Sequence, residues 1–254
     1  MIKKKDSNSE YHSHDSISAS GLKIIYKKSV YHYLNREKFV STPAMNFGSA
    51  VHSILLEPEK KEILALPGNL NLRTKKDREY KKQLIEDNPD KIIVSGEEKE
   101  FLDQIVQNAM NNELANKLLF TLDEIEYSYY GTYEEVPVRI RPDGIKKGRY
   151  IIDIKTCQDA SPKAFRSAIY NYAYHLQACF YSEMLGFDPS AFRFIAIENR
   201  YPFDVAVYSL SNDLIDRGKE AWRIAFDSWS EYIKHNRISG FHWADVNTDG
   251  SLIL

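Results

Sequence analysis

The chain has 254 residues, 43% of them hydrophobic and 28% charged, which fits a globular protein with one large domain or two small ones. The net charge of −2 excludes a strongly basic chain, although a local basic patch would be enough to bind nucleic acid. The only cysteines, Cys157 and Cys179, exclude a disulfide framework and favour a reducing, cytoplasmic setting. No apolar run approaches about 18 residues, so no membrane contact is expected.

The N-terminal segment, residues 1–15, is polar and lacks the apolar core of a signal peptide. It is predicted to be a flexible tail, and residues 16–254 are predicted to form a single domain, since no repeat or long linker divides them. Residues 17–34 are predicted to be helical, with Ser18 or Ser20 as the first cap.

A clearer helix is predicted for residues 44–57, between Pro43 and Pro58. It carries Gly48 and His52, which are four residues apart and therefore share a face. Gly48 would allow a backbone or a phosphate to approach closely. His52 is a candidate metal ligand or phosphate contact, although a single histidine is more often a packed or exposed side chain.

Residues 67–72 are predicted to be a loop, and residues 73–87 a charged helix. A second helix is predicted from Ser95, which forms a capping box with Glu98, to about residue 119. The charged helix is usually a solvated face, but it would bind phosphates if it lay beside a nucleic-acid site. Its basic residues are Arg73, Lys75, Lys76, Arg78, Lys81 and Lys82.

Alternating apolar residues predict two paired strands, residues 123–130 and 133–140, with the turn at Gly131. The second strand leads directly to Asp143. The pairing would bring the carboxylate of Glu126 within reach of Asp143. It is equally consistent with the sequence that Glu126 is an exposed carboxylate on a strand without a role in the site.

The stretch from Arg141 to Thr156, RPDGIKKGRYIIDIKT, combines two carboxylates and a lysine with an apolar strand. Residues 150–154 are strand formers, and side chains alternate along a strand, so Asp153 and Lys155 share one face. Burying an acid and a lysine is unfavourable unless they are paired or bind a metal ion. This placement therefore indicates a site.

The residue types in this stretch indicate phosphodiester hydrolysis with a divalent metal. Asp143 and Asp153 would be oxygen ligands of Mg²⁺, with the carbonyl of Ile154 completing the site. Lys155 would orient or deprotonate the attacking water and balance the charge on the phosphate, while the metal activates the water. The alternative is a hairpin that carries an aspartate–lysine pair on the surface. A match to so short a pattern usually has that explanation. Here the apolar strand around the pair favours a functional site.

A long helix is predicted from Ser161 to about residue 185, followed by strands at residues 191–198 and 203–210 and a last helix from Ser211 to about residue 235. On the long helix, one face carries a stripe of three tyrosines and one glutamine, and such a stripe usually packs into the core. A buried glutamine in it needs hydrogen-bond partners, which a phosphate or a base edge would supply. The stripe consists of Tyr170, Tyr174, Gln177 and Tyr181.

In their order, these segments resemble the PD-(D/E)xK nuclease superfamily, and within it the RecE-type (exonuclease VIII-like) exonucleases, which are related to RecB-type nuclease domains. The resemblance covers about residues 16–235. Five segments carry it together: SASGLK at 18–23, GSAVH at 48–52, RPD at 141–143, DIKT at 153–156, and YHLQ at 174–177 with Tyr181.

The resemblance implies an α/β fold with a restriction-endonuclease-like core, in which helices flank a central mixed β-sheet. It implies a metal site, for Mg²⁺ or alternatively Mn²⁺, made by His52, Asp143, Asp153 and the carbonyl of Ile154. The implied catalytic residues are Lys155, Asp143, Asp153 and Glu126, the last matched less closely because Glu124, Glu134 and Glu135 are near. The implied DNA contacts are Arg141, Thr156, Gln177 and Tyr181.

The function implied is a Mg²⁺-dependent exodeoxyribonuclease that degrades linear double-stranded DNA from 5′ to 3′ and leaves single strands for recombination by annealing. A phage-like protein of this kind would work with a RecT-like single-strand annealing protein and could form a homo-oligomeric ring. One alternative is a RecB-like nuclease for single strands, although two cysteines are too few for the iron–sulfur cluster common in that group. The other alternative is a catalytically silent DNA-binding protein that keeps the fold. The presence of Asp143, Asp153 and Lys155 argues against this alternative.

Overall fold

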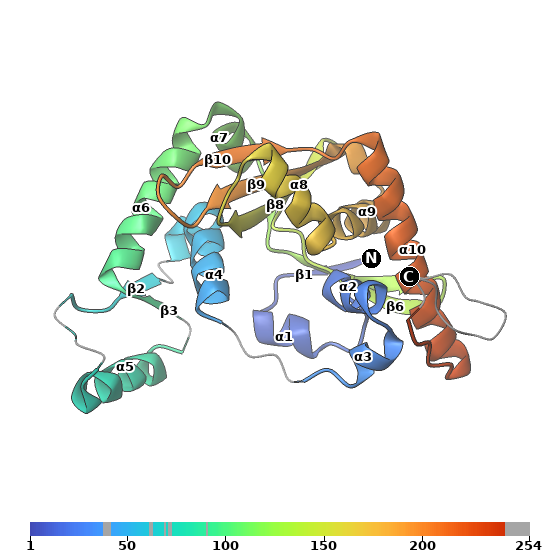
Figure 1. Ribbon diagram of the computed structural model, residues 1–254, viewed down its shortest axis with the longest axis horizontal. Helices are drawn as coiled ribbons and strands as arrows, with labels where there is room; N and C mark the ends of the chain where they lie inside the picture. The colour runs from blue at the N-terminus through green and yellow to red at the C-terminus, as the bar shows by residue number, and fades with distance from the viewer. Residues whose placement is uncertain (38–41, 61–62, 69, 71–72, 90, 242–254) are drawn as a thin grey trace.

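The computed structural model describes residues 1–37, 42–60, 63–68, 70, 73–89 and 91–241 (Figure 1). The helices are α1 (Asn8–Ser13), α2 (Ala19–Lys27), α3 (Val30–Leu34), α4 (Pro43–Leu56), α5 (Lys75–Asp87), α6 (Gly96–Asn111), α7 (Glu113–Phe120), α8 (Pro162–Asn171), α9 (Tyr174–Leu185) and α10 (Asn212–His235). The strands are β1 (Ile2–Lys4), β2 (Ile63–Ala65), β3 (Ile92–Val94), β4 (Glu124–Ile125), β5 (Ser128–Tyr133), β6 (Val136–Ile140), β7 (Gly144–Lys146), β8 (Tyr150–Cys157), β9 (Phe192–Glu198) and β10 (Val205–Tyr208).

The central sheet has the strand order β10-β9-β8-β7-β4. It is mixed, because β8 runs parallel to β9 and antiparallel to β7. Helices cover both faces, so the predicted α/β fold with a mixed sheet between helices is confirmed. None of the helices in the described ranges is long and apolar enough to cross a membrane.

Strand β8 shows the alternation that its sequence predicts. Ile151 packs into the hydrophobic cluster that includes Leu176 of α9, whereas Ile152 and Ile154 pack into a second cluster that includes Val51 of α4. Each of these isoleucines is at most 1% exposed, and full burial of such a side chain contributes roughly 2 kcal/mol. The two clusters therefore hold β8 firmly between α4 and α9.

A second sheet, β1-β5-β6, differs from its prediction in two places. The turn lies at Glu134 and Glu135, both with positive φ, because Gly131 stays inside β5 and pairs with Val138. A Cβ at Gly131 would lie 3.0 Å from the side chain of Met1, so glycine lets the N-terminal segment pass closely. Residues 123–130 are not one strand either, because β4 ends before Glu126 and pairs with β7.

The N-terminal segment differs from the flexible tail that was expected. Strand β1 pairs antiparallel with β5, with Ile2 opposite Tyr130. Ser7 then caps α1 through a capping box with Glu10, which satisfies the first amides of this short helix. Pairing with a distant strand is what orders this polar segment.

Two long predicted helices are interrupted. Ala173 adopts a left-handed conformation, with φ of 49°, and so separates α8 from α9. Tyr170 therefore does not continue the stripe of Tyr174. Asn112 likewise ends α6 and caps α7 with its side chain, on the amide of Ala115.

Helix α5 carries most of the predicted basic run and stands apart from the sheet, beyond the parallel pair β2–β3 (Figure 1). It has no buried residue, as expected for a solvated helix. Of the loop predicted at residues 67–72, residues 69, 71 and 72 lie outside the described residues; Pro67, Gly68 and Leu70 belong to neither a helix nor a strand.

Candidate functional site

Three side chains from separate parts of the chain meet beside β8. His52 comes from α4, Glu126 from the segment between β4 and β5, and Asp143 from the segment between β6 and β7. Their ligand atoms all lie within 4.8 Å of one another. Nδ1 of His52 is 3.4 Å from Oδ2 of Asp143 and 3.8 Å from Oε1 of Glu126. One nitrogen and two hard oxygens at this spacing form a donor set that suits a divalent metal ion.

Helix α4 places His52 because it packs directly on β8. Pro43 is its first residue, and Thr42 caps it through the amide of Met45. A Cβ at Gly48 would lie 3.2 Å from Oγ1 of Thr156, so glycine permits the close approach that its position predicts.

The other ring nitrogen of His52, Nε2, lies 3.1 Å from the carbonyl oxygen of Ile154. Its N–H can donate to that oxygen, which leaves Nδ1 facing the carboxylates. Asp143 is tied to the same peptide region, because the backbone N–H of Ile154 donates to its Oδ2 at 2.5 Å. The backbone of Ile154 thus positions both the histidine and the aspartate.

Glu126 reaches the cluster through an unusual backbone conformation, with φ of 54°. A left-handed conformation costs a residue other than glycine about 1–2 kcal/mol, and such strain concentrates at functional sites. The N–H of Glu126 donates to the carbonyl of Asp143 at 3.1 Å, which holds the strained residue in place. This conformation ends β4 and places the carboxylate near His52.

Asp153 and Lys155 share a face of β8, as predicted, and pair with each other. Nζ of Lys155 is 2.5 Å from Oδ2 of Asp153, which is 2% exposed. The other oxygen, Oδ1, accepts from Nε2 of Gln177 at 2.6 Å. Asp153 is therefore directed toward Lys155 and Gln177, next to the His52–Glu126–Asp143 cluster and not within it.

The charges of the cluster favour a bound cation. Burial alone would lower the pKa of His52, but the carboxylates of Asp143 and Glu126 outweigh it and raise this pKa to about 10. Burial raises the pKa of Asp143, and the charge of Asp153 adds to this in spite of His52. The carboxylates therefore hold a proton on the imidazole, and a divalent ion fits the same excess of negative charge.

Lys155 is held in its charged form. Burial alone would lower its pKa, but Asp153 and Asp143 outweigh burial and raise it. The ammonium also lies 4.9 Å from the centre of the Tyr174 ring, a cation–π contact. Of the two roles expected for Lys155, these contacts favour orientation and charge balance over deprotonation of water.

Three of the four residues expected to contact DNA are instead internal supports. Gln177 is 7% exposed and Tyr181 is 6% exposed, with the Tyr181 hydroxyl meeting Tyr11 and the backbone of Arg141. Arg141 donates to Oδ1 of Asp6 at 2.7 Å and is almost fully buried. For Gln177, protein groups thus supply the partners that a phosphate or a base edge was expected to supply.

Thr156 is half-buried and lies against Gly48, so its contact with DNA stays a prediction. Sequence reasoning missed the role of Lys23. Nζ of Lys23 is 2.5 Å from Oε1 of Gln177, so the amide of Gln177 joins Lys23 to Asp153. The available signal was the place of Lys23 at the end of the segment SASGLK at 18–23, one of the five that carry the resemblance.

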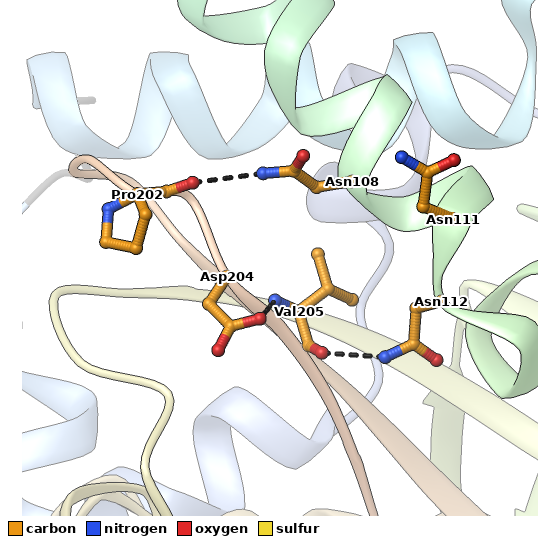
Figure 2. A pocket seen from close by; sticks show the side chains of 6 residues that line it. All are labelled: Asn108, Asn111, Asn112, Pro202, Asp204 and Val205. Atoms are coloured by element: carbon orange, nitrogen blue, oxygen red, sulfur yellow. Dashed lines mark hydrogen bonds between the residues drawn. The ribbon is translucent and has the colours of Figure 1, made fainter.

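A surface depression lies apart from these residues, between the β9–β10 connection and the end of α6 (Figure 2). Two of its amides already have partners: Asn108 donates to the carbonyl of Pro202 at 3.0 Å, and Asn112 to that of Val205 at 2.8 Å. These bonds hold the β9–β10 hairpin against α6. The depression therefore has a structural explanation.

Comparisons with known proteins concern the family and the fold of the chain. The model of one protein family, described as a PDDEXK-like domain of unknown function (DUF3799), matches residues 18–238. No curated protein matches the chain. A solved structure from Eubacterium rectale, described as "Putative exonuclease", has a TM-score of 0.55 at 13% identity and covers 95% of this chain and 92% of its own; it shows the fold. The structure of SSO0001 matches at 15% identity, over 78% of this chain and 90% of its own, but its TM-score of 0.30 carries no argument.

Proposed function

The chain belongs to the family of PDDEXK-like domains, and from this we propose that it is a metal-dependent nuclease that hydrolyses phosphodiester bonds of DNA. One observation carries the proposal: the cluster of His52, Glu126 and Asp143 lies beside the ion pair of Asp153 and Lys155. The first group can hold a cation and the second presents a lysine. A bound cation can activate water, and a positive charge beside the phosphate can stabilise the transition state of phosphodiester hydrolysis.

His52, Glu126 and Asp143 would hold the divalent ion. Asp153 and the carbonyl of Ile154, the further ligands that the sequence predicts, would have to exchange their contacts with Lys155, Gln177 and His52 to join it. A bound ion would supply activation of water and stabilisation of the charge that develops on the phosphate and the leaving oxygen. We propose Mg²⁺ for this site, with Mn²⁺ as the alternative, because oxygen donors predominate in it.

Lys155 acts on the substrate side of the site. Asp153 holds its ammonium at 2.5 Å and the ring of Tyr174 lies next to it, so the side chain is ordered before substrate arrives. An ordered cation stabilises negative charge on a phosphate more in the transition state than in the ground state, because no reorganisation is needed. Lys155 would thus contribute mainly to turnover.

The finer proposal is an exonuclease that degrades linear double-stranded DNA from 5′ to 3′, in the cytoplasm, beside a RecT-like single-strand annealing protein and with a ring as its assembly. Its support is the resemblance of five ordered segments to RecE-type exonucleases. The solved relative described as an exonuclease supports the same class, although it shares only the fold.

The test is digestion of linear duplex DNA that is labelled at either the 5′ or the 3′ end, beside a covalently closed circle, in Mg²⁺. Loss of the 5′ label first, with the circle spared, supports the proposal. Efficient nicking of the circle would indicate an endonuclease. No cleavage of any DNA by protein that binds Mg²⁺ would refute the nuclease function and favour a silent DNA-binding protein. Asp143→Asn serves as the inactive control.

A further inference from the structure

Lys23 is a second lysine beside the site that the roles above do not use. Its side chain is half-buried on α2, with Nζ 2.5 Å from Oε1 of Gln177 and 5.1 Å from the centre of the Tyr174 ring. The ammonium of Lys155 lies 4.9 Å from the same ring centre. The two nitrogens therefore cannot be farther apart than the sum of these distances, 10.0 Å.

The two lysines differ in how their charges are balanced. Lys155 has the carboxylate of Asp153 as its partner. Lys23 has the neutral amide of Gln177 and the ring of Tyr174, and none of the described carboxylates lies within ion-pair distance of its ammonium. Burial and the charge of Lys155 lower the pKa of Lys23 to about 7, although Asp153 opposes them. An anion arriving next to Lys23 would therefore relieve an unfavourable arrangement.

The position of Lys23 is fixed by its helix. Ser18 caps α2 through the amide of Gly21, and the flanking residues Leu22 and Ile25 are fully buried. Helix α2 packs against α9, which carries Gln177 and Tyr174, and against α10. The ammonium is thus held toward the site by buried neighbours, unlike a surface lysine that is free to choose its contacts.

We propose that Lys23 binds a backbone phosphate of the nucleic acid, next to the phosphate that Lys155 faces. The inference rests on the proposed nuclease function and adds a substrate contact to it. The backbone of a nucleic acid carries a row of phosphodiester anions, and an ammonium binds such an anion as a point charge. Both ammoniums lie within about 5 Å of the centre of the Tyr174 ring, so one strand can contact both.

The alternative is a purely positioning role, in which Lys23 orients Gln177 and through it Asp153. The two roles predict different effects of salt. Each phosphate that a protein neutralises adds about 0.9 to the magnitude of the negative slope of log affinity against log salt on duplex DNA, because counterions are released. A lysine that only positions other side chains adds nothing to this slope.

The experiment measures duplex DNA affinity over a salt series, with Ca²⁺ in place of Mg²⁺ to prevent cleavage. Lys23→Met keeps the aliphatic stem and removes the charge, and Lys23→Arg keeps the charge. Lys28→Met, at the exposed end of the same helix, is the matched control for loss of one positive charge. We expect Lys23→Met to weaken binding about tenfold and to reduce the magnitude of the negative slope by about 1, while the other two variants keep the slope of the unaltered protein. Thermal unfolding confirms that each variant is folded.

An unchanged slope and affinity in folded Lys23→Met would overturn the inference. So would an unchanged slope combined with weaker Mg²⁺ binding by calorimetry, since that result assigns Lys23 to positioning Asp153. Cleavage by the unaltered protein is measured separately in Mg²⁺. If that protein bound DNA without cutting it, the nuclease function would fail, while the salt slopes would still decide the role of Lys23.

Discussion

The imidazole of His52 lies 3.4 Å from the carboxylate of Asp143, and the backbone of Ile154 contacts both side chains. One peptide of β8 therefore sets the distance between two proposed metal ligands that come from different elements. Strand β8 is buried between two hydrophobic clusters, so this distance is maintained without the ion. Such preorganisation reduces the cost of binding a metal.

Removal of either proposed ligand should abolish tight metal binding. We expect His52→Ala and Asp143→Asn to lower both Mg²⁺ affinity and cleavage at least about 100-fold, because even the residues that support metal ligands typically contribute 10–100-fold. Isothermal titration calorimetry and single-turnover cleavage are the measurements. Near-native turnover by either folded variant would contradict the assignment.

Glu126 should show a trade between stability and metal affinity. Glu126→Gly removes the strain of the left-handed conformation, so the free energy of unfolding should rise by up to about 1 kcal/mol. Metal affinity should fall in the same variant. Urea denaturation and calorimetry measure the two effects. Glu126→Gln is the control that keeps the strained backbone, and it should lose affinity without gaining stability.

Lys155 should affect turnover more than binding. Lys155→Ala is expected to lower single-turnover cleavage by at least about 100-fold, since the loss of one preorganised electrostatic contact typically costs 10²–10³ in rate. DNA affinity in Ca²⁺ should change much less. Lys155→Arg should rescue poorly, because the planar guanidinium cannot occupy the place of a compact ammonium beside Asp153. Lost DNA binding with an unchanged rate at saturating DNA would make Lys155 a phosphate anchor.

The link between the N-terminal segment and Arg141 should make stability depend on pH. Burial alone would raise the pKa of Asp6, but hydrogen bonds with Ser128 and Tyr130 and the contact with Arg141 lower it from 3.8 to about 2. A lowered pKa stabilises the folded state above the unfolded pKa, and the contribution disappears as the pH falls through about 2.

Asp6→Asn should therefore lower the free energy of unfolding by about 1–2 kcal/mol at pH 7. Most of the difference from the unaltered protein should vanish near pH 2. Urea denaturation at the two pH values measures it. Asp15→Asn, at an exposed carboxylate of the same segment, is the matched control and should change stability little. An equal loss at both pH values would show that Asp6 acts through packing and not through its charge.

Local features were predicted well because they depend on near neighbours in the chain. Alternation along residues 150–154 correctly placed Asp153 and Lys155 on one face of a buried strand. Gly48 and His52, four residues apart, were expected on one face of a helix, and both lie against β8. The capping box of Ser95 and Glu98 is also present.

The interruptions were not predictable in the same way. Gly131 reads as a turn, yet pairing with β6 and passage of Met1 keep it inside a strand. Ala173 has high helix propensity, yet it takes the left-handed conformation between α8 and α9. In both places tertiary packing outweighs a local preference of about 1 kcal/mol, because many distant contacts act together.

Composition and local spacing were enough to predict which chemical groups are present and that Asp153 and Lys155 share a face, because hydrophobic alternation and helical spacing depend only on local geometry. The contacts between distant elements depend on the whole fold: Glu126 lies with His52 and Asp143, whereas Gln177 joins Asp153 to Lys23. These contacts follow from how β8 packs between α4 and α9. That packing is set by the summed burial of residues far apart in the chain, which no short stretch of sequence contains.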